Sequence, residues 1–186
     1  MSQALWALGR GTGIVALLMF TLTLVLGVTT RSGRPLGLGR FGIADLHRTA
    51  ALTGTGLILV HVVSLYFDPY AQLRLVDFLV PFLGSYRPVW LGLGTLALDL
   101  LGLITVVSLL RQRIGPRIFR AVHWGTYVLW PVALLHALGN GTDAGSAWMT
   151  GIAAACVLAV AVAVGWRLLP SYDGRGWRRA PRKVHA

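Results

Sequence analysis

Charged side chains are scarce in this sequence of 186 residues. It contains no glutamate and a single lysine, and Asp, Glu, Lys and Arg together account for 12% of the residues. Soluble globular domains carry about 25% of these residue types. Because hydrophobic residues reach 55% and the mean hydropathy is +0.68, the composition excludes an ordinary soluble domain and is typical of a membrane-embedded protein.

Cysteine is nearly absent as well. Cys156 is the only one and lies inside an apolar stretch, so no disulfide forms within one chain and a thiol-based metal site is not supported. The glycine-rich pieces at 9–13 and 92–94 are not nucleotide fingerprints, because neither lies between a predicted strand and a helix. The sequence therefore has no recognisable nicotinamide- or flavin-binding domain of its own.

The apolar residues form runs near the ~20 residues that cross a bilayer. They predict an all-α integral membrane protein with a bundle of five transmembrane helices, at about 4–28, 43–67, 89–110, 118–138 and 148–169. The mixed segment 68–87 predicts a short amphipathic helix at the interface, between the second and third spans. We expect residues 1–169 to form the membrane domain and residues 170–186 a basic cytoplasmic tail.

A signal peptide is the alternative for the first apolar run. Such peptides begin with a charged segment and have a shorter apolar core. Here no charge precedes Arg10, the apolar run is longer, and several arginines follow it. We therefore expect a retained helix.

The formal net charge of +11 would suit a nucleic-acid-binding protein. The basic residues, however, lie between the apolar runs rather than on a soluble face, so we expect a lipid bilayer and no nucleic acid as partner. One set of connecting segments holds 14 of the basic residues, and the other holds only Arg10, Arg74 and Arg87. Because basic residues favour the cytoplasmic side, this asymmetry predicts a multi-pass plasma-membrane protein with its N-terminus outside and its C-terminus in the cytoplasm.

Four of the five histidines lie in two of the predicted spans. His47 and His61 are 14 positions apart in the second span, and His123 and His136 are 13 apart in the fourth. At 1.5 Å per residue, each pair spans ~20 Å along its helix, so the histidines lie at two depths of a ~30 Å core. Because both spans run in the same direction, we expect His47 to face His123 near the cytoplasm and His61 to face His136 near the outside.

Such pairs suit the two axial positions of a haem iron. Zinc requires three or four ligands on one ion, which pairs ~20 Å apart cannot supply. Purely structural histidines are the other alternative, but polar side chains inside a bilayer are costly and usually functional. A difficulty remains: 13 residues leave His123 and His136 about 140° apart on an ideal helix. This requires either staggered haems or a distorted helix, for which Pro131 is a candidate site.

Several other residues are candidates for contact with such a cofactor. Arg10 and Arg87 on the outer side, and Arg48 and Arg120 on the inner side, are placed to bind haem propionates. The alternative is that they only set the topology and extend to the interface. Trp130, seven residues after His123, lies on nearly the same helix face. It is expected either between the two haems or in ordinary packing.

The pattern His47-x13-His61 followed by His123-x12-His136 resembles the ferric-reductase-like transmembrane domain family over roughly residues 4–169. The segments GRGTG at 9–13 and YRPVW at 86–90 are similar more weakly. The family is the haem-bearing module of ferric reductases, NADPH oxidases and the membrane partner of periplasmic methionine sulfoxide reductase. The resemblance implies that the inner and outer histidine pairs each bind a b-type haem and pass electrons across the membrane. Cytochrome b of quinol-oxidising complexes is a more distant alternative, since its Pro-Glu-Trp-Tyr motif is absent.

One departure from the family concerns the electron donor. Ferric reductases and NADPH oxidases carry a cytoplasmic flavin and nicotinamide domain, which this sequence lacks. The resemblance therefore implies an oxidoreductase membrane component supplied by a separate flavoprotein, a flavin at the basic inner rim, or a quinol. The outer acceptor is left open among a metal chelate, oxygen and a redox protein. The alternative function is a non-enzymatic haem-binding or docking subunit of a larger redox complex.

Overall fold

The computed structural model describes residues 2–32 and 40–169, and helices are the only regular secondary structure in this part of the chain. The helices, in chain order, are α1 (Ser2–Ser32), α2 (Arg40–Tyr66), α3 (Leu75–Leu79), α4 (Pro88–Leu109), α5 (Arg111–His123), α6 (Thr126–Asn140) and α7 (Ala147–Leu168). This confirms the predicted all-α class. The predicted cytoplasmic tail, 170–186, lies outside the described residues.

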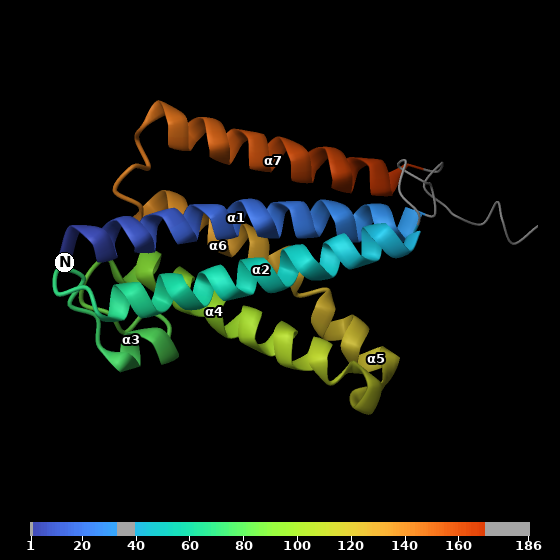
Figure 1. Ribbon diagram of the computed structural model, residues 1–186, viewed down its shortest axis with the longest axis horizontal. Coiled ribbons are helices and arrows are strands. Elements are labelled where there is room, and N and C mark those ends of the chain that lie inside the picture. The colour runs from blue at the N-terminus through green and yellow to red at the C-terminus, as the bar shows by residue number, and fades with distance from the viewer. Residues whose placement is uncertain (1, 33–39, 170–186) are drawn as a thin grey trace, which may run out of the picture.

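Four of these helices are long and apolar enough to cross a membrane. They are α1, α2, α4 and α7, with apolar segments at Gln3–Thr29, Phe41–Tyr66, Pro88–Leu109 and Ala147–Leu168. Their bounds agree with four of the five predicted spans to within a few residues at most ends. Figure 1 shows them running side by side along the long axis of the molecule.

The remaining predicted span, 118–138, is divided between α5 and α6. The break lies at Trp124–Gly125, where the hydroxyl of Thr126 donates to the carbonyl of His123 at 2.9 Å. Glycine has low helix propensity, and a threonine hydroxyl competes for backbone groups, so the regular helix is interrupted here. With 15 residues, α6 is ~22 Å long, short of a ~30 Å core. A fifth crossing, made by α5 and α6 together, stays a prediction.

The predicted interfacial helix is much shorter in the structure than segment 68–87. Only α3 forms there, and it has five residues. Arg74 caps it: the backbone N–H donates to Asp77 Oδ2 at 2.9 Å and Nη2 donates to Oδ1 at 3.1 Å. These hydrogen bonds hold the pKa of Asp77 below its usual value. Thr95 Oγ1 donates to the Asp77 carbonyl at 2.6 Å and so ties α3 to α4. A position at the membrane surface stays a prediction.

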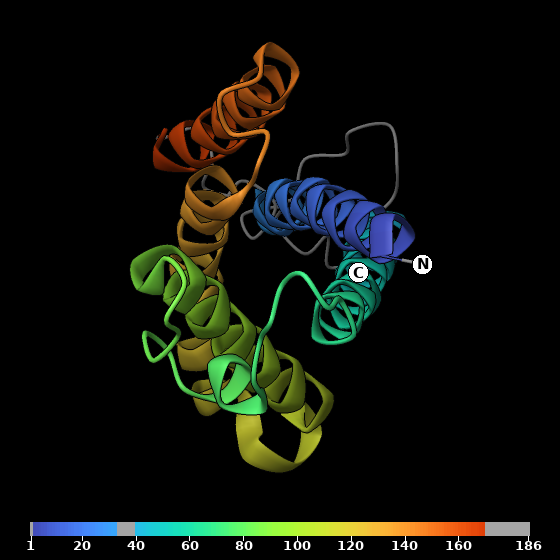
Figure 2. The same ribbon diagram turned by 90° about the vertical axis from the view of Figure 1, so that its left-hand side faces the viewer.

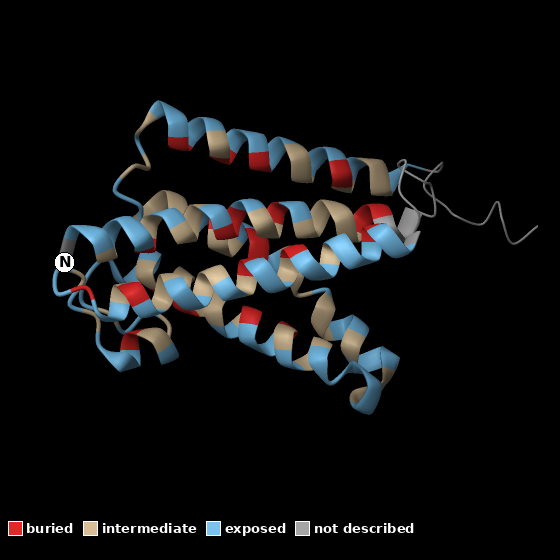
Figure 3. Cartoon of the chain, in the orientation of Figure 1, coloured by how far each residue is buried: buried red, intermediate tan, exposed pale blue. Residues whose placement is uncertain are grey.

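The helices pack as two pairs with α7 beside them. Viewed along the bundle in Figure 2, α1 and α2 form one pair, α4 and α6 the other, and α7 lies against α1 and α6. One core cluster joins α1, α6 and α7 around Leu17, Trp130 and Cys156, and a second joins α4 and α6 around Ile104 and Leu129. Figure 3 shows that the buried residues lie on faces turned toward other helices. The outward faces carry many exposed leucines and valines, as suits contact with lipid.

Candidate functional site

The four paired histidines come from three helices. His47 and His61 lie near opposite ends of α2, His123 is the last residue of α5, and His136 lies on α6. The ring centroids of His47 and His123 are 6.2 Å apart. The Nδ1 atom of His61 lies against α1, at Gly9 O, and that of His136 lies against α4, at Trp90 O. The structure thus brings His47 and His123 together, as expected from the sequence. The pairing of His61 with His136, and metal ligation by any of the four, stay predictions.

The spacing of the inner pair suits one metal ion between two imidazoles. A bond from a metal to an imidazole nitrogen is about 2 Å, and the ring centre lies about 1 Å beyond that nitrogen. Two axial imidazoles on one ion therefore have centroids ~6 Å apart. The observed 6.2 Å between the centroids of His47 and His123 is compatible with this spacing. Their rings are inclined to each other by 65° and do not stack.

Hydrogen bonds fix the tautomer of three of the histidines. In each, the imidazole Nδ1 lies within hydrogen-bond distance of a backbone carbonyl on a neighbouring helix. The contacts are His47 to Thr23 O at 2.8 Å, His61 to Gly9 O at 2.6 Å and His136 to Trp90 O at 2.7 Å. A carbonyl oxygen only accepts, so Nδ1 carries the proton and Nε2 keeps its lone pair. This is the tautomer in which a histidine binds a metal through Nε2.

A glycine of the neighbouring helix lies against each of these three imidazoles. A Cβ placed at Gly27 would be 3.2 Å from His47 Cε1, and one at Gly13 would be 2.9 Å from His61 Nδ1. At Gly94 it would be 2.5 Å from His136 Cε1. Sequence reasoning missed these glycines and the three carbonyls. A signal was nonetheless present, since Gly13 and Gly27 are 14 positions apart, as are His47 and His61.

His123 is held differently from the other three. Its Nδ1 is buried and finds no hydrogen-bond partner among the described residues. Its ring instead stacks on Phe119, with centroids 5.1 Å apart and an interplanar angle of 25°. Packing rather than a hydrogen bond therefore orients this imidazole.

The turn at Trp124–Gly125 bears on the 13-residue spacing of His123 and His136. Here three N–H groups donate to the carbonyl three residues earlier in the chain, whereas in an α-helix they would donate to the carbonyl four residues earlier. The pairs are Gly125 to Val122, Tyr127 to Trp124 and Val128 to Gly125. Such 3₁₀ winding turns about 20° further per residue than an α-helix. Three residues would close ~60° of the ~140° gap. The structure thus shows a distorted helix, with the break at 124–125 while Pro131 stays inside α6. The distortion leaves ~80° of the gap, and staggered haems stay a prediction.

Both outer arginine candidates bind groups at the C-terminal end of α6 or in the loop that follows it. Arg10 forms an ion pair with Asp143, and its guanidinium lies 4.0 Å above the ring of Trp6. Arg87 Nη1 donates to the Gly139 carbonyl at 2.9 Å. The two arginines thus connect the C-terminal end of α6 and the following loop to α1 and α4. Contact of either with a haem propionate stays a prediction.

The inner candidates and Trp130 have other surroundings. Arg48 and Arg120 are exposed, and Arg120 Nε donates to the Pro116 carbonyl at 3.0 Å. Trp130 is buried in the cluster shared by α1, α6 and α7, and its Nε1 donates to Thr21 Oγ1 at 2.9 Å. The structure therefore places Trp130 in helix packing, one of the two positions expected for it.

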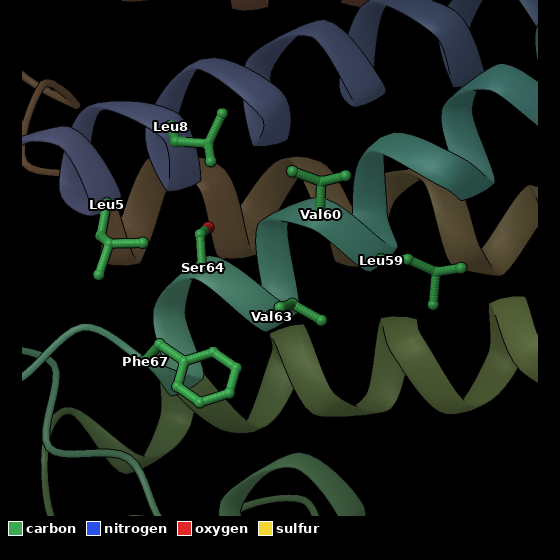
Figure 4. A pocket seen from close by; sticks show the side chains of 7 residues that line it. All are labelled: Leu5, Leu8, Leu59, Val60, Val63, Ser64 and Phe67. Atoms are coloured by element: carbon green, nitrogen blue, oxygen red, sulfur yellow. The ribbon is translucent and has the colours of Figure 1, made fainter.

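A shallow apolar pocket opens between α1 and α2, with Val60, the chain neighbour of His61, in its wall. It has a volume of 280 Å³, and Leu8, Val60 and Phe67 are among its walls (Figure 4). Its one polar side chain, Ser64, donates to the carbonyl of His61 at 2.8 Å. No titratable side chain lines it.

Comparison with known proteins gives one match. The model of a family described as the ferric reductase like transmembrane component matches residues 12–134. This stretch contains His47, His61 and His123 and ends two residues before His136. No curated protein and no solved structure matches significantly.

Proposed function

The chain belongs to the family of ferric-reductase-like transmembrane components, and on this premise we propose that it carries electrons across a membrane through two haem groups. The observation that carries the proposal is the state of the histidines. His47 and His123 meet across helices, and three of the four histidines direct Nδ1–H to a backbone carbonyl, which leaves the Nε2 lone pair free to bind a metal.

Each pair would hold one b-type haem. His47 and His123 would bind the inner one, and His61 and His136 the outer one. When bound between two imidazoles, the iron supplies reversible one-electron chemistry and has no open position for a further ligand. The residues of the chain hold the imidazoles at two depths, ~21 Å apart along α2, and surround them with apolar helices.

The charge distribution supports a direction for this transfer. Arg111, Arg113 and Arg117 are exposed on α5, which lies at the end of the bundle where α1 ends and α7 ends (Figure 1). A basic end favours the cytoplasmic side of a plasma membrane and attracts anionic groups. Electrons would enter near His47 from a flavoprotein, a flavin at this rim or a quinol. They would leave near His61 to a metal chelate, oxygen or an outer redox protein.

Haem stoichiometry tests the proposal. The purified protein should contain two haems per chain by the pyridine haemochrome assay, and His61→Ala should contain one. His185→Ala replaces the one histidine outside the pairs and should still contain two. A wild-type ratio near zero would contradict the proposal. Two haems that no flavoprotein or quinol reduces would support the non-enzymatic haem-binding subunit instead.

A further inference from the structure

We propose that Gly13, Gly27 and Gly94 are positioning residues for three of the four histidines. Each leaves a backbone carbonyl of its own helix open to an imidazole from the neighbouring helix. The inference rests on the proposed haem ligation and deepens it, because it assigns the residues that set the tautomer and electron-donating strength of the ligands.

The same local arrangement occurs three times. In every case the carbonyl that accepts from Nδ1 belongs to the residue four positions before the glycine. The sets are Gly9 before Gly13, Thr23 before Gly27 and Trp90 before Gly94. In an α-helix the residue at i lies one turn above the carbonyl of i−4, and its Cβ points back toward that turn. A side chain at the glycine would therefore occupy the place from which the imidazole reaches the carbonyl.

The space at these glycines is filled by the imidazoles themselves. A Cβ at Gly94 would be 2.6 Å from His136 Nδ1, and one at Gly13 would be 2.9 Å from His61 Nδ1. A Cβ at Gly27 has more room, at 3.4 Å from His47 Nδ1. By contrast, a Cβ at Gly11 or Gly102 would meet no described atom within 4 Å beyond its own stretch of helix. Close contact with a histidine is thus specific to three glycines and not general to glycines of the bundle.

The register of α1 against α2 explains why α1 provides a glycine beside each of the two histidines of α2. The two helices are antiparallel neighbours, so Gly27 lies beside His47 and Gly13 beside His61 (Figure 1). Fourteen residues make nearly four helical turns, so both glycines lie on one face of α1 and both histidines on one face of α2. The outer pair is completed by Gly94 of α4. The inner pair receives only one such support.

The hydrogen bonds that these glycines permit would affect both the orientation and the electron-donating strength of the imidazoles. A hydrogen bond from Nδ1–H to a carbonyl fixes the ring and makes Nε2 a stronger donor. A stronger donor favours oxidised iron and lowers its reduction potential. If the glycines served only to let helices approach closely, replacing them would weaken the fold and would not affect one haem more than the other.

Alanine substitutions separate these two roles. Gly94→Ala and Gly13→Ala should each weaken retention of the outer haem by about tenfold or more, and should leave the low-spin EPR signal of the inner haem in place. Gly27→Ala should keep both haems and raise the reduction potential of the inner one. Gly11→Ala and Gly102→Ala, on α1 and α4, are the matched controls and should change neither signal nor potential.

The outcomes distinguish this inference from the proposed function. Wild-type protein without haem would overturn the proposed function. Wild-type protein with two haems, together with an unchanged outer signal and potential in Gly94→Ala, would overturn the role of the glycines. If Gly94→Ala and Gly13→Ala lose both haems through misfolding, Gly27→Ala decides, and an unshifted inner potential in it would refute the inference.

Discussion

Neutral backbone carbonyls, rather than carboxylates, receive the Nδ1 protons of His47, His61 and His136. A carboxylate is the common alternative partner of a metal-binding histidine, but it would add a charge inside the apolar bundle, where charges are costly. A carbonyl is already present in every helix turn and needs only to be uncovered. This explains how a chain without glutamate supplies such partners at both depths.

The contact between Arg74 and Asp77 at the start of α3 gives a prediction for acidic pH. Because the Arg74 hydrogen bonds lower the pKa of Asp77 in the folded protein, they stabilise the fold above the unfolded-state value of about 3.9. The stabilisation is lost as pH falls through the lower folded-state pKa. The difference in thermal unfolding temperature between wild type and Asp77→Asn, measured in detergent, should therefore shrink as pH falls from 7 to 3.

Asp45→Asn is the control for this pH series. Asp45 is exposed on α2, so the variant should follow the wild type at every pH. A wild-type advantage over Asp77→Asn that stays constant down to pH 3 would contradict an electrostatic contribution from Asp77.

The helices and the depths of the four histidines could be predicted from the sequence, because both follow from regular spacing along the chain. The spacing of the four histidines determines their depth, and the run of apolar residues determines the helices that carry them. The partners of the imidazoles were not predictable in the same way, because every residue has a carbonyl. Only the packing of α1 on α2 and of α6 on α4 shows which ones face a histidine.

Among the elements, the turn between α5 and α6 reduces the angle between His123 and His136. The continuous apolar run 118–138 predicts a single span, with Pro131 as the candidate site of a distortion. In the structure Pro131 lies within α6, while 3₁₀-type bonds tighten the backbone around Gly125. A proline removes one backbone N–H donor from the helix. A threonine hydroxyl beside a glycine competes for backbone hydrogen bonds and bends the helix locally.

An inserted residue tests the importance of this turn. One alanine between Trp124 and Gly125 should rotate His123 by ~100° relative to α6. Since α6 is fixed in the core by Trp130 and Leu134, the inner haem should be lost and the outer one kept. Haem content and EPR spectra would measure this.

A matched insertion shows whether the effect is local. One alanine between Ala144 and Gly145 lies in the loop before α7, where an added residue is tolerated more readily. This variant should retain both haems. If the insertion at 124–125 also retained both, the turn would have no role in aligning the pair.

For the whole molecule, the number of crossings decides where the termini lie. The four long apolar helices alone would return the C-terminus to the side of the N-terminus. A fifth crossing made by α5 and α6 places the termini on opposite sides, as the distribution of arginines predicts. The family match supports a multi-pass membrane protein but does not choose between these topologies.

Cysteine labelling distinguishes the two arrangements. In a Cys156→Ala background, which removes the only native thiol, single cysteines would replace Gln3 and Ala186. In intact cells a membrane-impermeant maleimide should label the first and not the second. Permeabilised cells, in which both should react, provide the control. Equal labelling of both in intact cells would contradict an odd number of crossings.

The contact of α1 with α2 also has a consequence for the order of assembly. These helices are adjacent in the chain and precede α5 and α6, and together they contain His47, His61 and both of the carbonyls that orient them. We therefore expect the tautomers of His47 and His61 to be set before His123 and His136, on α5 and α6, have left the ribosome. We expect the helical hairpin α1–α2 to act as a template, with cofactor capture as the last step of biogenesis.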